Sequence, residues 1–297
     1  MRLRLRETTL DLAGGDPLLM GIVNANPDSF SDAVRLDTLD KQVAHALELV
    51  ADGAAMIDVG GESGVTYTGV SGEDAEAGWV LPLVSALITE GVTVSVDTWK
   101  ASVAERALDA GAHVINDTSG LADPRLAQLC AASGAALVVM HTRAAPKQVG
   151  FPDYGGDVRG DVVRFLAERC ALARDLGVAD EQLIVDPGPD FAKSPAESVE
   201  VMADLGALQS LGRPILAAIS RKYFVGAITG RAPQERLAGT LAAVGEAADA
   251  GAAILRVHDV RDAADFLAVR AVLRGERAMP AFDTEDERLK WIPMVEE

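Results

Sequence analysis

Short, almost wholly apolar runs alternate along this chain with longer amphipathic stretches. Such runs are typical of strands buried on both faces, and the longer stretches repeat their apolar positions with a helical period. Eight strands are predicted, at Leu18–Val23, Ala55–Val59, Thr93–Val96, His113–Ile115, Ala136–Met140, Leu183–Val185, Pro214–Ile219 and Ala253–Val257. Helices are predicted between them, over residues 37–52, 73–90, 99–110, 124–133, 158–176, 195–211, 221–249 and 260–274.

Strand-then-helix units that follow one another in this way predict an α/β fold, the (β/α)8 or TIM barrel. An open, doubly wound sheet is the alternative. It is disfavoured because no G-x-G-x-x-G motif follows the first predicted strand. We expect one domain over residues 1–297, with the barrel at 18–275 and an acidic tail at 276–297.

The segment before the first barrel strand, residues 1–17, has a pattern of its own. Polar and apolar residues alternate in Arg2–Arg6 and Thr9–Leu12, and two glycines follow at Gly14 and Gly15. Alternation with a period of two is typical of a strand with one buried face. These residues therefore predict a short hairpin that covers the bottom of the barrel.

Charge and cysteine content narrow the possible partners. The chain has 297 residues and a formal net charge of −18 without a basic stripe, so nucleic acid and anionic membrane surfaces are excluded as expected partners. Met1–Arg6 lacks the apolar core of a signal peptide, and no apolar run approaches the roughly 18 residues of a membrane span. Cys130 and Cys170 are interpreted as buried thiols, and we expect a cytoplasmic protein.

A polar residue stands at nearly every point where a predicted strand ends. In a barrel these points meet at one mouth, where binding and reacting side chains are found. The polar residues are Asn24, Asp58, Asp97, Asn116, Asp117, His141, Asp186, Ser220, Lys222, Arg256, His258 and Asp259. Burying so many polar groups without a ligand is costly, so a shared ligand site is predicted there. A single Asp after a strand is more often a helix N-cap, and Asp58, Asp117 and Asp259 keep that alternative.

The residue types at this mouth suit a flat heterocycle. Asp97, Asn116 and Asp186 supply acceptors and an amide for a ring that carries several N–H and NH2 donors. Lys222 and Arg256 add cationic donors for a carbonyl oxygen or a phosphate, and a guanidinium also stacks on rings. The simpler alternative for Lys222 is a salt-bridged lysine at the rim.

Two further residues point to an anion or a metal ion. His258 and Asn24 could hold a phosphate or the water shell of a Mg²⁺ ion. The simpler alternative for His258 is a capped, structural histidine.

The motifs at these strand ends resemble a known family. They are Met20-Gly-Ile-Val-Asn24, Pro27-Asp-Ser-Phe-Ser-Asp32, Asp58-Val-Gly-Gly-Glu-Ser63, Ser95-Val-Asp-Thr98, Ile115-Asn-Asp117, Asp186-Pro-Gly188 with Phe191 and Lys193, Ser220-Arg-Lys222, and Arg256-Val-His-Asp259. Each motif alone is weak. In this order, over residues 18 to about 270, they resemble the dihydropteroate synthases, the family of pterin-binding barrels.

The resemblance implies a reaction and a set of roles. The family joins 6-hydroxymethyl-7,8-dihydropterin pyrophosphate to p-aminobenzoate and releases pyrophosphate. By analogy, Asp32, Lys222 and Arg256 are implied to be catalytic, and Asn24 to bind Mg²⁺ on the pyrophosphate. The implied substrate-binding residues are Asp97, Asn116, Asp186, Phe191, Ser220, Lys222, Tyr223, Arg256 and His258. Family members commonly form homodimers, so a homodimer is expected.

Some positions depart from the family pattern, mostly on the aminobenzoate side. The family usually has Thr where Asn26 stands, Gly-Gly in place of Ala33-Val34, Thr-Arg-Pro-Gly after Ser63, and a small Ser in place of Tyr223. The usual Gly in the approach of the seventh strand is Ala218. Three alternatives follow: a paralogue that uses another arylamine, a pterin-binding protein without synthase activity, and a folate-methyl transferase that acts with a corrinoid partner.

Overall fold

The computed structural model describes residues 1–12, 15–26, 36–62, 69–148 and 150–281. Eight strands form one parallel sheet in the order β8-β7-β6-β5-β4-β3-β10-β9. These strands are β3 (Leu18–Asn24), β4 (Ala54–Gly60), β5 (Val94–Asp97), β6 (Val114–Asp117), β7 (Ala136–Met140), β8 (Leu183–Asp186), β9 (Leu216–Ala218) and β10 (Ile254–Val257). A bridge between Val185 and Ile215 brings the two end strands together, so the predicted barrel is confirmed.

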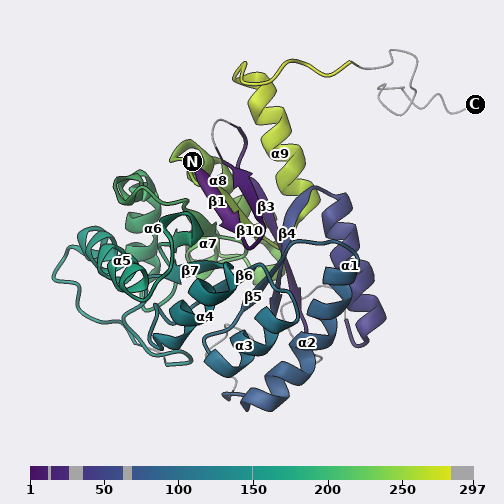
Figure 1. Cartoon of the computed structure of the whole chain (residues 1–297). Helices are drawn as coiled ribbons and strands as arrows, with labels where there is room; N and C mark the ends of the chain where they lie inside the picture. The colour runs from purple at the N-terminus through teal and green to yellow at the C-terminus, as the bar shows by residue number, and fades with distance from the viewer. Residues whose placement is uncertain (13–14, 27–35, 63–68, 149, 282–297) are drawn as a thin grey trace, which may run out of the picture.

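Helices surround this sheet, as Figure 1 shows. They are α1 (Leu39–Ala51), α2 (Glu73–Thr89), α3 (Ala101–Asp109), α4 (Arg125–Ser133), α5 (Val158–Asp175), α6 (Pro195–Ala203), α7 (Tyr223–Thr229), α8 (Leu237–Asp249) and α9 (Val260–Leu273). Among the described residues, no helix combines the length and the apolar character that a membrane crossing requires.

Two of the predicted helices are interrupted in the structure. The segment predicted as one helix at 221–249 divides into α7, a 3-10 turn and α8, because Gly230 adopts a left-handed φ of 71° and Pro233 begins a new turn. The segment at 195–211 leaves the α-helical form at Asp204 and continues as a 3-10 helix, Leu205–Leu211. Asp and Gly are weak helix formers, and Gly206 follows directly.

The hairpin predicted at the chain start is confirmed. β1 (Arg2–Leu5) pairs antiparallel with β2 (Thr8–Asp11). Leu3 and Leu5 are fully buried and join an apolar cluster inside the barrel. The N–H of Arg6 donates to the carbonyl oxygen of Gly134 at 2.9 Å, which ties the hairpin to the loop before β7. The hairpin therefore seals the amino-terminal end of the barrel with leucine side chains.

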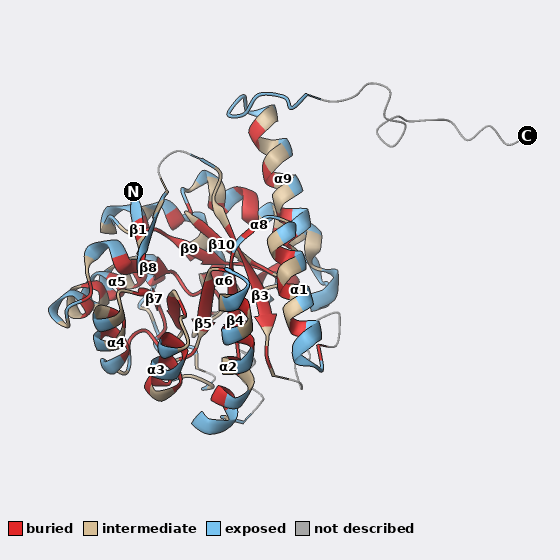
Figure 2. Ribbon diagram, turned by 45° about the vertical axis from the view of Figure 1, so that its right-hand side comes forward, coloured by how far each residue is buried: buried red, intermediate tan, exposed pale blue. Residues whose placement is uncertain are grey.

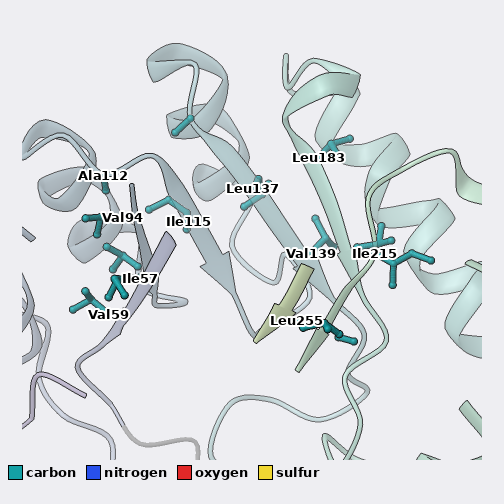
Figure 3. Close-up of a cluster of buried hydrophobic side chains, with 14 of the residues drawn as sticks. Ile57, Val59, Val94, Ala112, Ile115, Leu137, Val139, Leu183, Ile215 and Leu255 are labelled. Carbon is teal, nitrogen blue, oxygen red and sulfur yellow. The ribbon is translucent and has the colours of Figure 1, made fainter. Parts of the chain in front are cut away.

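A second apolar cluster fills the space between the sheet and the helices. It includes the fully buried Ile57, Val94, Ile115, Leu137 and Val139, which Figure 3 shows side by side on neighbouring strands. Figure 2 shows the same arrangement for the whole molecule, with buried residues on the strands and exposed ones on the outer faces of the helices. The strands are held from both sides, which gives their carboxyl ends fixed positions.

Candidate active site

Polar residues form a layer inside the barrel, directly above the apolar inner cluster. Asp58, Asn116, Asp186 and Arg256 each follow an apolar residue of that cluster by two positions, namely Met56, Val114, Ile184 and Ile254. Side chains two positions apart in a strand point to the same face. The same alternation that turns the apolar residues inward therefore turns these four polar residues into the barrel.

The strand register completes this layer. Gly60 of β4 pairs with Asn24 of β3 and with Asp97 of β5, and Asp97 pairs with Asn116 of β6. Asn24, Asp97 and Asn116 consequently lie at one level at the carboxyl end of the sheet. Gly60 adds no side chain between them; a Cβ there would lie 3.6 Å from the Asn24 Oδ1 atom and 3.9 Å from the Asp97 Cβ atom.

Asp58 organises the polar layer. Its Oδ1 atom accepts a hydrogen bond from the Ser95 hydroxyl at 2.5 Å. Its Oδ2 atom accepts from Asn116 Nδ2 at 3.0 Å and from Arg256 Nε at 2.6 Å. Arg256 also donates from its second terminal nitrogen to Asp97 Oδ2, at 3.0 Å. Asp58, on β4, thus binds side chains from three other strands, β5, β6 and β10.

The helix-cap interpretation of Asp58 is therefore wrong. Asp58 lies within β4, is fully buried, and accepts its hydrogen bonds from inward-facing side chains. Asp117 does support a local turn, through the N–H groups of Ser119 and Leu121. Asp259 occupies the N-cap position of α9, but its carboxylate pairs with Arg221 at 2.7 Å.

Two acceptors in this layer are available to a ligand. The Oδ1 atom of Asn116 is buried and has no hydrogen-bond partner among the described residues. Asp186 is 2% exposed and accepts one hydrogen bond from the Gly188 N–H at 2.7 Å. A buried acceptor without a donor costs free energy until a donor arrives. The arrangement therefore fits a ligand that presents N–H groups.

Two acids of the site, Asp97 and Asp186, have raised pKa values. Burial raises the pKa of Asp97 to about 7, with Arg256 opposing the shift and Asp58 adding to it. Burial also raises the pKa of Asp186, against the stabilising N–H of Gly188. A donor-rich or cationic ligand lowers both costs, because hydrogen bonds to a carboxylate favour its charged form.

The cationic side of the site comes from the loop after β9 and from the end of β10. The Lys222 ammonium lies 4.4 Å from the centroid of the Phe191 ring, and burial lowers the pKa of Lys222. His258 Nδ1 lies 2.9 Å from the Ser220 hydroxyl, which also accepts the backbone N–H of His258 at 3.2 Å. Burial, with Arg221 and Arg256 nearby, lowers the pKa of His258 to about 3, so this imidazole is neutral at pH 7.

Other predicted site residues lie at the edge or elsewhere. Tyr223, the first residue of α7, is 60% exposed and does not fill the inside of the barrel. Asn24 is half-buried at the end of β3. Asp32, Ala33-Val34 and residues 64–68 fall outside the described residues. His141 turns away from the mouth: its Nε2 atom lies 2.9 Å from Asp161 Oδ2 on α5.

A buried ionic cluster beside the mouth was not expected from the sequence. Lys100 donates to Glu62 Oε2 at 2.7 Å, to Glu76 Oε2 at 2.6 Å and to the Ser71 carbonyl oxygen at 2.7 Å. Glu62 belongs to the motif after β4, which was the one available signal. Nothing in the chain pattern indicates that Lys100 would reach it. In the described part of the chain, no group of three His, Cys, Asp or Glu side chains could hold a metal ion alone.

The comparisons with known proteins agree with this geometry. The model of the family described as "Pterin binding enzyme" matches residues 20–258, which include every described residue of the polar layer. The chain belongs to the pterin-binding enzyme family. The resemblance seen in the motifs is thereby confirmed.

Named relatives of this pterin-binding barrel are dihydropteroate synthases. That of Bacillus subtilis is 42% identical over 249 residues, covering 83% of this chain and 85% of that protein. The structure of the Xanthomonas albilineans enzyme with 4-aminobenzoic acid has a TM-score of 0.84 and 39% identity, covering 94% of this chain and 99% of that one. The same enzyme with 7,8-dihydropteroate has a TM-score of 0.82 and 38% identity, covering 94% and 100%.

Proposed function

We propose that this chain is a dihydropteroate synthase, which condenses 6-hydroxymethyl-7,8-dihydropterin pyrophosphate with p-aminobenzoate in folate biosynthesis. The products are 7,8-dihydropteroate and pyrophosphate. The observation that carries the proposal is the buried, unpartnered Asn116 Oδ1 atom between Asp97 and Asp186 in the inward polar layer. Relatives that share the fold at 36–42% identity are named for this reaction and support it.

The pterin is held through its N–H and NH2 groups. Asn116 Oδ1 and the Asp186 carboxylate accept from the ring edge, while the Lys222 ammonium donates to a ring acceptor. Asp58 and Asp97 hold the Arg256 guanidinium from two sides, at 2.6 and 3.0 Å, so its plane is fixed before the ring arrives. A preset guanidinium loses little freedom on binding, which favours stacking on the pterin.

The reaction exchanges a carbon–oxygen bond for a carbon–nitrogen bond. The bond between the pterin methylene carbon and the pyrophosphate oxygen breaks, and the aniline nitrogen attacks that carbon and loses a proton to water. Arg256 and the Nε2–H of His258 stabilise the charge that develops on pyrophosphate. Since no protein nucleophile is required, positioning of the two substrates supplies much of the rate.

Magnesium fits this site as a companion of the pyrophosphate. Asn24 carries an amide oxygen at the level of the polar layer, and Gly60 adds no side chain next to it. Mg²⁺ usually takes one or two protein oxygens and completes its shell with waters and phosphate oxygens. In this role the ion would neutralise charge on the leaving group, and Asn24 would be one of the residues that hold it.

The rim of the site bears on the second substrate. Tyr223 stands exposed where α7 begins, next to Lys222, so an aromatic ring and a hydroxyl lie at the rim. The altered residues at 64–69 and Tyr223 favour a second candidate, a paralogue that accepts another arylamine. A hydroxyl at this rim also suits the carboxylate of p-aminobenzoate.

We also infer a cytoplasmic homodimer. Cys130 and Cys170 are buried, unpaired thiols whose pKa values burial raises, as suits a reducing compartment. Exposed apolar residues on the outer helices, Ile228 on α7 with Val269 and Leu273 on α9, offer area for a second copy. Sedimentation of the purified chain would measure the oligomeric state.

The test of the function uses the full chain with both substrates and Mg²⁺. We expect 7,8-dihydropteroate by mass spectrometry and an equal amount of released pyrophosphate. Asp186→Asn, which keeps the shape and removes the charge, should abolish product formation. If the pterin raises the melting temperature but no product forms with p-aminobenzoate, a panel of other arylamines would separate the paralogue from a protein without transferase activity.

A further inference from the structure

The loop between β8 and α6, residues 187–194, has an unusual backbone. Gly188, Asp190 and Ala192 adopt positive φ angles of 60°, 65° and 52°. At Gly188 a Cβ would lie only 2.2 Å from the carbonyl oxygen of His141, so only glycine fits. Asp190 and Ala192 are L-residues in a conformation that costs free energy, and such conformations persist only where the surroundings enforce them.

The side chain of Lys193 holds the backbone of this loop together. This side chain is 1% exposed and is the largest by volume among the fully buried side chains of the described residues. The ammonium donates to three backbone carbonyl oxygens, those of Gly188 at 2.8 Å, Phe191 at 3.1 Å and His141 at 3.3 Å. An ammonium has three N–H donors, so each of them finds an acceptor. These bonds close the loop on itself and attach it to the end of β7.

The loop delivers two groups to the active site. Phe191 presents its ring to the Lys222 ammonium at 4.4 Å. Asp190 accepts the backbone N–H groups of Tyr223 and Phe224, the first two residues of α7. Lys222 is the N-cap residue of that helix. The ring and the carboxylate thus hold Lys222 from two directions, and both depend on the shape of the loop.

We propose that Lys193 is a positioning residue for pterin binding: its ammonium fixes the 187–194 loop so that Phe191 and Asp190 place Lys222 at the pterin. Lys193 acts through this loop, since its three donors are all engaged by backbone carbonyls. This role adds a residue to the site and rests on the proposed function only for the identity of the ligand.

Opposing effects act on the protonation of Lys193. Burial lowers the pKa of Lys193 to about 7, with Asp186, Asp161 and Asp190 favouring the charged form and Lys222 opposing it. A neutral amine would still donate twice, but more weakly to carbonyls. We therefore expect the amide of Lys193→Gln to hold the loop in part and the thioether of Lys193→Met not to hold it.

The experiment compares Lys193→Met, Lys193→Gln, Phe191→Leu and the double variant Lys193→Met/Phe191→Leu. Calorimetry would measure the affinity for pterin pyrophosphate, and steady-state kinetics would measure the KM of each substrate. Both measurements would be made at a temperature well below the melting temperature of every variant. We expect K193M to weaken pterin affinity about 30-fold and K193Q about 5-fold. The aminobenzoate KM should rise by a smaller factor, because Asp190 of the same loop also holds the backbone of Tyr223. The pterin affinity of the double variant should be at most about threefold lower than that of K193M, because both substitutions disrupt the same series of contacts.

A destabilised control separates positioning from general support. Leu3→Ala, at the far end of the barrel, lowers stability without touching the loop and should leave pterin affinity unchanged. Wild-type pterin affinity in folded K193M, or fully multiplicative losses in the double variant, would overturn the proposal. If K193M does not fold, wild-type affinity in K193Q overturns it as well. Weakened binding in a chain that makes no dihydropteroate would leave this inference standing while the proposed reaction fails.

Discussion

The two ends of this barrel are made by the same strands and have opposite chemistry. At the amino-terminal end, Leu3 and Leu5 seal an interior of apolar side chains. At the carboxyl end, Asp58 and Arg256, which follow the apolar Met56 and Ile254 by two positions, form a buried ionic network, and the Oδ1 atom of Asn116 beside it has no hydrogen-bond partner among the described residues. The comparison teaches that one end is optimised for stability, whereas the other gives up stability to hold groups that a ligand will satisfy.

The largest effect should follow from breaking the network at its centre. Asp58→Asn removes the charge that Arg256 faces and places an NH2 donor against other donors. We expect a loss of about 3 kcal/mol in the free energy of unfolding and about 100-fold in kcat/KM for the pterin substrate. Urea unfolding and steady-state kinetics would measure the two.

Asp117→Asn is the matched control for that change. Asp117 is equally buried at the end of β6, but its carboxylate supports only a local turn. It should lose stability while keeping the pterin KM. Equal pterin kinetics in the two variants would contradict the central place given to Asp58.

The opposite end should respond with stability alone. Leu3→Ala leaves a cavity under the strands and should reduce the free energy of unfolding by about 2–5 kcal/mol. The catalytic rate and both KM values, measured on the folded enzyme at low temperature, should not change. A change in the pterin KM would show that packing at the amino-terminal end affects pterin binding at the carboxyl end.

An effect of comparable size is expected from pH at the polar end. Burial raises the pKa of Asp97 to about 7, so between about pH 4 and 7 the folded chain holds a proton that the unfolded chain has released. The free energy of unfolding should therefore fall as the pH rises through this window. Asp97→Asn should lack this contribution, and the difference between the two pH curves isolates it. Parallel curves would show that Asp97 ionises normally.

The smallest effect is expected at the rim. Tyr223→Phe removes a single exposed hydroxyl and should raise the KM for p-aminobenzoate about threefold, the worth of one exposed hydrogen bond. The pterin KM serves as the internal reference and should stay constant. No change in either KM would place the aminobenzoate carboxylate elsewhere and strengthen the case for another arylamine.

Much of the site could be predicted because the relevant signals are local. The period of two along a strand places Asp97, Asn116 and Asp186 inward together, and the barrel brings strand ends to one mouth. The sequence cannot tell which way a residue points just past the last strand position. His141 stands one residue beyond Met140 and so turns to the helix layer, where it meets Asp161 and the ring of Phe165.

Other features depend on contacts between distant segments. The carboxylate of Asp58 looks like a helix cap until β4, β5, β6 and β10 are closed into one barrel, where the inward side chains of these strands meet. The reach of Lys100 to Glu76 likewise needs the packing of α2 against α3. Helix breaks were foreseeable at Gly230 with Pro233, since both are strong breakers, although the alanine-rich surroundings suggested one continuous helix.

The bridge between Val185 and Ile215 has a mechanical consequence. Elsewhere neighbouring strands share longer ladders, whereas β8 and the three-residue β9 meet at a single seam, with Val185 N–H donating to the Pro214 carbonyl at 3.0 Å. Asp186 lies on the β8 side of this bridge, and Ser220 and Lys222 lie on the β9 side. A small separation of β8 and β9 would widen the entrance for a bicyclic ligand without breaking the longer ladders between other strands. We therefore expect the amide hydrogen of Val185 to exchange with solvent faster than that of Val139.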